Sequence, residues 1–198
     1  DLEIHVPAAV AYGVWHYVTV TGDRAFLHDC GTEMLIEISR FFASHGSWSS
    51  TTGEFGMWGV MGPDEFHMMV HNNAYTNTLA KKTFEWTLDA IGGMKRDVPD
   101  RWSALERTLG VAPEELDDWR TMAEHMRLQR DADTGLIEQQ DGYFDLPDID
   151  LEAIPPAQLP VVKKWPYISR SRFKWIKQPD VLLLHFFFSH DYSPAEKR

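Results

Sequence analysis

The chain has 198 residues, of which 43% are hydrophobic and 13% aromatic, and a formal net charge of −11. This composition is typical of a globular domain with one sizeable core. Because phosphate backbones and anionic lipid surfaces need a clustered positive face, the charge argues against nucleic acid and membranes as partners. Cys30 is the single cysteine and cannot form an internal disulfide, so we expect a cytoplasmic protein.

Apolar residues at helical spacing predict two helices at the start of the chain. From Ala8 to Thr19 they recur at three and four positions, and Thr21-Gly22-Asp23 ends that helix. A second helix is predicted from Arg24 to about His45. Between Gly46 and Gly62, Ser, Thr and Gly alternate with aromatic residues, which favours a short hairpin or an extended excursion.

Further along, Asn72 or Asn73 can cap a helix that runs to about Ala90, and Gly92-Gly93 is predicted to end it. A short helix is expected over Arg101–Leu109. Pro113 then begins an amphipathic helix that extends to about Arg130.

Regular periodicity fades from Asp131 to Lys174, where prolines recur among Asp, Trp and Tyr, so this segment is predicted to be a long excursion. The last helix is expected to begin near Pro179 and to contain the run VLLLHFFF. The sequence therefore predicts an all-α chain of about six helices joined by long loops, and function on the loops.

One loop, GPDEFHMMVHNN, is rich in groups that carry chemistry. Glu65, His67 and His71 resemble metal ligands, but Met68 stands where a zinc-protease motif has its Glu, and we expect no metal. The acidic segment Asp131–Gly142 likewise departs from the glycine position of a calcium loop and is predicted to be a turn.

Two interpretations of Glu65 stay open from the residues alone. The Gly62-Pro63 turn could hold Glu65 against apolar neighbours, where desolvation would raise its pKa and keep it protonated as a general acid. Alternatively, Asp64 and Glu65 merely complement the dipole of the following helix. Lys177 and Gln178 have a similar ambiguity, because their donors suit sugar hydroxyls but equally suit an exposed helix start.

Four segments, taken in order, resemble glycoside hydrolase family 65, the maltose, trehalose and kojibiose phosphorylases and their hydrolytic relatives. They are EIHVPAAVAYGVWHYVTVTGD, GVMGPDEFHMMVHNNAYTN, DGYFDL and WIKQPDVLLL. The resemblance implies that residues 1–198 are part of a single (α/α)6 toroid, with roughly half of its helices, and that the remainder of the enzyme lies outside this chain.

The resemblance also implies an activity, the inverting cleavage of α-glucosidic bonds. Glu65 would be the general acid, and Lys177 and Gln178 would bind the nonreducing glucose. The nucleophile would be phosphate in a phosphorylase or activated water in a hydrolase, and no cofactor is expected beyond phosphate as co-substrate. The expected partner is an α-linked glucose disaccharide or glucoside, and a homodimer is compatible with the resemblance. The alternative is a non-catalytic carbohydrate-binding or structural protein on the same toroid.

Overall fold

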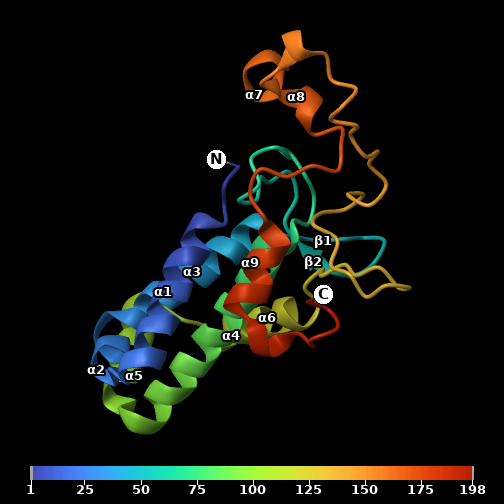
Figure 1. The fold of residues 1–198 in the computed structure, drawn as a ribbon. Coiled ribbons are helices and arrows are strands. Elements are labelled where there is room, and N and C mark those ends of the chain that lie inside the picture. Colours follow the sequence, from blue (N-terminus) through green and yellow to red (C-terminus); the bar gives the residue numbers. More distant parts are fainter. Residues whose placement is uncertain (1, 198) are drawn as a thin grey trace. The chain divides into compact units, whose positions relative to one another are not determined.

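The computed structural model describes residues 2–197 (Figure 1). The chain divides into two compact units. The helical unit comprises His5–Met57 and Thr76–Arg127. The loop unit comprises Trp58–Tyr75 and the chain from Leu128 onward, together with the segment that ends at Ile4.

The helical unit contains the long helices that the periodicity predicts and, in chain order between two of them, a small hairpin (Figure 1). Its elements are α1 (Val6–Thr21), α2 (Arg24–Phe26), α3 (Thr32–His45), β1 (Ser47–Trp48), β2 (Phe55–Gly56), α4 (Ala74–Asp97, from Thr76 onward), α5 (Pro99–Leu109) and α6 (Pro113–Glu124). The two strands pair antiparallel. The fold is therefore helical as predicted, and the expected hairpin between Gly46 and Gly62 is present.

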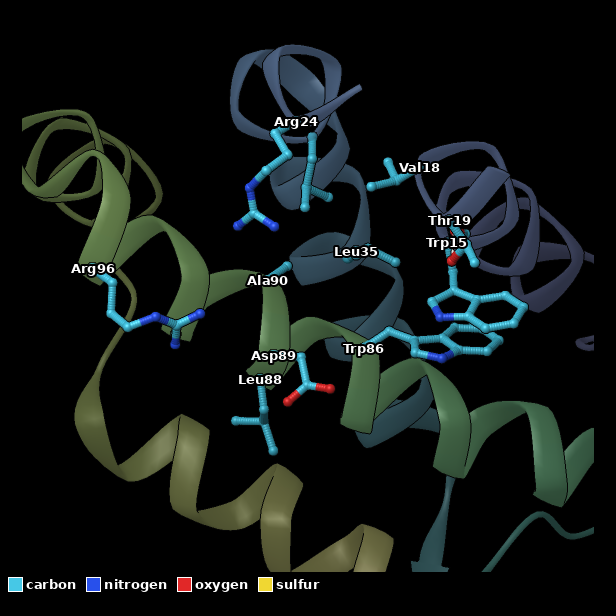
Figure 2. A pocket seen from close by; sticks show the side chains of 12 residues that line it. Trp15, Val18, Thr19, Arg24, Leu35, Trp86, Leu88, Asp89, Ala90 and Arg96 are labelled. Atoms are coloured by element: carbon cyan, nitrogen blue, oxygen red, sulfur yellow. Dashed lines mark hydrogen bonds between the residues drawn. The ribbon is translucent and has the colours of Figure 1, made fainter. Parts of the chain in front are cut away.

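Aromatic and polar contacts pack the helices of this unit against one another. Trp15 of α1 stacks on Trp86 of α4, with ring centroids 5.1 Å apart, beside a cavity of about 370 Å³ (Figure 2). Ser39 of α3 and Thr87 of α4 share a buried hydrogen bond of 2.8 Å between their hydroxyl oxygens. The Trp pair thus belongs to a helix interface, in keeping with core packing rather than a sugar-stacking cleft.

The helix predicted from Arg24 to His45 is interrupted by one π-helical turn, Leu27–Gly31, between α2 and α3. Asp23 caps its start, since its Oδ1 accepts a hydrogen bond of 2.9 Å from the amide of Phe26. The predicted helical span is otherwise confirmed.

The prediction that Gly92-Gly93 ends a helix is wrong, because α4 continues to Asp97. A Cβ on Gly93 would lie 3.0 Å from Arg24 Nη2, which itself donates to Asp97 Oδ2 at 2.7 Å. Interior glycines cost a helix about 1 kcal/mol each. Here Gly93 leaves room for Arg24, and tertiary packing outweighs the local propensity.

The predicted end of the following helix near Arg130 is also wrong, because α6 ends at Glu124. The chain then runs extended beside β2. Phe55 donates its amide to the His125 carbonyl at 2.9 Å, and Arg127 donates its amide to the Phe55 carbonyl at 2.7 Å. These backbone pairs replace helical ones, a choice that the amphipathic pattern does not reveal.

The loop unit is mostly irregular, as predicted for Asp131–Lys174. Its helices are α7 (Val161–Lys164), α8 (Tyr167–Arg170) and α9 (Asp180–Phe187). Rings of Trp165 and Trp175 lie 5.7 Å apart, and the Lys174 amide donates to the Pro147 carbonyl at 2.9 Å, so the excursion is ordered by long-range contacts. Among the described residues, no helix is both long and apolar enough to cross a membrane.

Candidate active site

The segment that contains Glu65 is a closed loop and not the start of a helix. Val60 and Val70 exchange two backbone hydrogen bonds of 2.9 Å and close the loop at its base. Within it, Glu65 and Phe66 form a turn, and helix α4 begins only at Ala74. Eight residues thus separate Glu65 from the helix, which removes the interpretation that its charge complements the dipole in the first turn.

The three residues predicted for the site come together within the loop unit. Lys177 Nζ donates to Glu65 Oε2 at 2.7 Å, and Gln178 Nε2 donates to Glu65 Oε1 at 2.9 Å. The Gln178 Oε1 atom in turn accepts from the Glu65 amide at 3.3 Å. The Glu65 side chain remains 43% exposed, so the carboxylate is both held and reachable by a ligand.

The expected rise of the Glu65 pKa through desolvation is wrong. The hydrogen bond from Lys177, followed by that from Gln178, lowers the pKa of the Glu65 carboxyl, and the raising effect of burial is smaller. The sequence argument assumed that Phe66 and the methionines would surround the carboxylate. Instead, Phe66 is buried and its ring lies 5.2 Å from that of Trp175, while Glu65 points to the two donors.

Two buried carboxylates beside Glu65 were not predicted as functional. Asp64 is 1% exposed and Asp180 is 0% exposed. Asp64 donates its amide to Asp180 Oδ1 at 2.7 Å and accepts the Lys177 amide on its own Oδ1 at 2.9 Å. Burial, reinforced by the Asp64 charge, raises the pKa of Asp180 to about 7. The sequence offered one hint, since Asp64 lies within GPDEFHMMVHNN and Asp180 within WIKQPDVLLL.

The two histidines of the loop serve its architecture. His67 is buried, and its Nε2 lies 2.9 Å from the Trp175 carbonyl oxygen, to which it donates. His71 Nδ1 accepts from the Gly59 amide at 3.1 Å. Among residues 2–197, no three His, Cys, Asp or Glu side chains gather in a way that could hold a metal ion. Each histidine thus uses one ring nitrogen to bind a backbone group within the loop unit.

The acidic segment that begins at Asp131 forms a turn, as predicted. Asp131 Oδ1 accepts from the amides of Asp133 and Thr134 and from the Thr134 hydroxyl, at 3.2, 2.7 and 2.6 Å. Gly135 follows with a φ of 73°, a left-handed conformation that suits glycine. The carboxylate is therefore satisfied locally.

A cavity of about 250 Å³ lies in the loop unit next to His67. Met68, Met69, Tyr143 and Leu146 line it together with His71. The Tyr143 ring packs edge-on against His67 at 5.4 Å, and burial raises the pKa of the Tyr143 hydroxyl. The loop that carries Glu65 thus borders, through His67 to His71, a cavity with both polar and apolar lining residues.

Comparison with known proteins assigns the chain to a family. A sequence model described as the glycosyl hydrolase family 65 central catalytic domain matches residues 1–198. The chain is 35% identical over 202 residues to a kojibiose phosphorylase of Caldanaerobacter subterraneus subsp. tengcongensis, covering 100% of this chain and 26% of that protein. It is 34% identical to an α,α-trehalose phosphorylase of Thermoanaerobacter brockii, covering 98% and 25%. It is 36% identical to a 1,2-α-glucosylglycerol phosphorylase of Bacillus selenitireducens, covering 97% and 25%.

A solved structure provisionally named as a kojibiose phosphorylase from the human microbiome superposes with a TM-score of 0.86 at 34% identity. The match covers 96% of this chain and 26% of that one. The chain thus spans about a quarter of the length of the relatives it matches. The predicted fold class, an all-α part of an (α/α)6 toroid, is confirmed. With a family match over its whole length, the chain belongs to glycosyl hydrolase family 65.

Proposed function

We propose that the protein that includes this chain is an inverting α-glucoside phosphorylase, in which Glu65 is the general acid. Residues 1–198 would form part of its single catalytic domain. The observation that carries the proposal is the convergence of Lys177 and Gln178 on the Glu65 carboxylate, at 2.7 and 2.9 Å. Lys177 and Gln178 are separated from Glu65 by more than a hundred positions in the chain.

The arrangement suits a glycosidic bond that is cleaved with help from a proton. Lys177 carries three donors, and Gln178 both donates and accepts, so a glucose unit can bind to both through its hydroxyls. Glu65 would then lie next to the glycosidic oxygen that becomes the leaving group. Protonation of that oxygen in the transition state is the task of a general acid.

A general acid must hold a proton before it can donate one, and the hydrogen bonds from Lys177 and Gln178 to Glu65 disfavour this. Lys177 and Gln178 lower the pKa of Glu65. A sugar whose hydroxyls accept the hydrogen bonds of Lys177 and Gln178 removes those donors from the carboxylate. Glu65 would then regain a higher pKa, take up a proton and become competent as the acid only when substrate is bound.

The relatives named above are phosphorylases, which favours phosphate as the nucleophile. An inverting hydrolase needs a second carboxylate that activates water. Asp64 and Asp180 are buried, and every carboxylate oxygen of the two accepts a hydrogen bond from a protein group. Neither would serve as that base, whereas phosphate attacks without one.

The test is the turnover of α-linked glucose disaccharides by the full-length protein, with and without phosphate. We expect phosphate-dependent formation of β-glucose 1-phosphate. In the Glu65→Gln variant, turnover should fall by about 10²- to 10⁴-fold, the contribution typical of a general acid. The matched control is Glu152→Gln, which makes the same change on an exposed side chain of the loop unit and should retain turnover.

Other outcomes would change the proposal in defined ways. Glucose release that does not depend on phosphate would show a hydrolase. Glycan binding without any cleavage would show a non-catalytic carbohydrate-binding protein. Normal turnover by the Glu65→Gln variant would remove Glu65 from the role of general acid.

A further inference from the structure

The backbone around Glu65 is held by side chains rather than by secondary structure. The amides of three consecutive residues each donate to a side-chain oxygen. Asp64 donates to Asp180 Oδ1 at 2.7 Å, Glu65 to Gln178 Oε1 at 3.3 Å, and Phe66 to Asp64 Oδ1 at 3.1 Å. Two of these acceptors come from the segment that also carries Lys177, so the two segments fix each other.

The Asp64 side chain binds backbone amides of both segments. Its Oδ1 accepts from the amide of Phe66, next to Glu65, and from the amide of Lys177, at 3.1 and 2.9 Å. Its Oδ2 accepts from Gln139 Nε2 at 2.9 Å. One buried carboxylate therefore sets the position of the acid relative to the cation that contacts it.

Asp180 and Asn73 extend this hydrogen-bond network to the Gly62-Pro63 turn. Asn73 Nδ2 donates to Asp180 Oδ2 at 2.8 Å, and the pair lies directly against Gly62. A Cβ on Gly62 would come within 2.4 Å of both Asn73 Nδ2 and Asp180 Oδ2. The glycine in the Gly-Pro turn is thus required by close approach, and its φ is not positive.

We propose that Asp64 is a positioning residue for proton donation by Glu65, which it aligns with Lys177 through two backbone amides. The inference rests on the proposed function. A purely structural buried aspartate would matter equally to every substrate. Loss of a positioning residue should slow mainly those reactions whose leaving group needs a proton. A misaligned acid impairs only the proton-donation step.

The experiment compares two substrates in the full-length protein, with phosphate present in both assays. One is an α-linked glucose disaccharide, whose sugar leaving group needs a proton. The other is α-glucosyl fluoride, whose leaving group departs without one. We expect Asp64→Ala to reduce kcat on the disaccharide by about 10²-fold and on the fluoride by less than about 10-fold. Asp64→Asn keeps an oxygen acceptor for both amides and should restore much of the disaccharide rate.

Two further variants make the result decisive. Asp133→Asn changes an exposed aspartate of the same unit and should leave both rates unaltered. Equal losses on the two substrates, or no loss on either, would overturn the inference. If Asp64→Ala does not yield folded protein, Gln139→Leu removes the donor to Asp64 Oδ2 and should give the same selective loss, about 10-fold in size.

Glu65→Gln, measured in parallel, separates the two levels of the argument. If Glu65→Gln loses disaccharide turnover and retains fluoride turnover while Asp64→Ala does not, Glu65 keeps its role and only the positioning role fails. If Glu65→Gln keeps normal turnover on both substrates, the proposed function fails, and the positioning role fails with it.

Discussion

The helical unit and the loop around Glu65 reach an ordered structure by opposite routes. In the helical unit, α1, α3 and α4 satisfy their backbone groups within each helix, and side chains such as Trp15 and Trp86 are left to pack. In the loop, the amides of residues 64–66 have side chains as partners. Repeating backbone hydrogen bonds tolerate side-chain changes, whereas a loop of this kind depends on individual atoms. Single substitutions should therefore lower the free energy of unfolding far more in the loop than in the helices.

The largest difference is expected for the same substitution placed in each region. Gly62→Ala would bring a Cβ within 2.4 Å of Asn73 and Asp180, and Gly13→Ala in α1 meets no atom within 4 Å. We expect Gly62→Ala to lower the free energy of unfolding by more than about 3 kcal/mol, as severe overpacking does. Gly13→Ala should instead raise it by about 0.5–1 kcal/mol.

Chemical denaturation of the two full-length variants measures both effects. Equal stability of the two variants would show that the loop tolerates side-chain changes as a helix does.

Asp180 should make the stability of the loop region depend on pH, because burial raises its pKa to about 7 in the folded protein. The unfolded chain has the ordinary, lower value, so the folded state binds a proton more tightly. The associated stability is fully present below pH ~4 and is lost as the pH rises to about 7, by about 4 kcal/mol.

Unfolding free energies of the full-length protein and its Asp180→Asn variant, measured from pH 4.5 to 8, test this dependence. As the pH rises, the unfolding free energy of the Asp180→Asn variant should increase relative to that of the unsubstituted protein. A difference that stays constant with pH would contradict the assignment to Asp180.

The smallest of these effects is expected at a polar contact between helices. Thr87 Oγ1 donates to the Thr83 carbonyl at 2.7 Å and lies 2.8 Å from Ser39 Oγ, in a fully buried position. Thr87→Val leaves the Ser39 hydroxyl without this partner and should cost about 1–2 kcal/mol in unfolding free energy. Adding Ser39→Ala should recover part of the loss, because the orphaned hydroxyl is then removed. No recovery in the double variant would show that the contact has little weight.

Sequence reasoning was accurate where the signal is local and repeated. All of the predicted helices are present, and the irregular segment from Asp131 onward is irregular. It failed where tertiary contacts override propensity, at Gly92-Gly93 and at the end of α6. Both errors have one cause, a partner distant in the chain, namely Arg24 in the first case and Phe55 in the second.

For the candidate site, the residue types alone left the roles of Glu65, Lys177 and Gln178 open, and the motifs that resemble the family indicated these three side chains. Only the tertiary structure decided the charge state of Glu65 and revealed Asp64 and Asp180 as its support. The physical reason is that a pKa and a hydrogen bond depend on which groups lie within about 3 Å. Across more than a hundred residues, only the folded chain determines that.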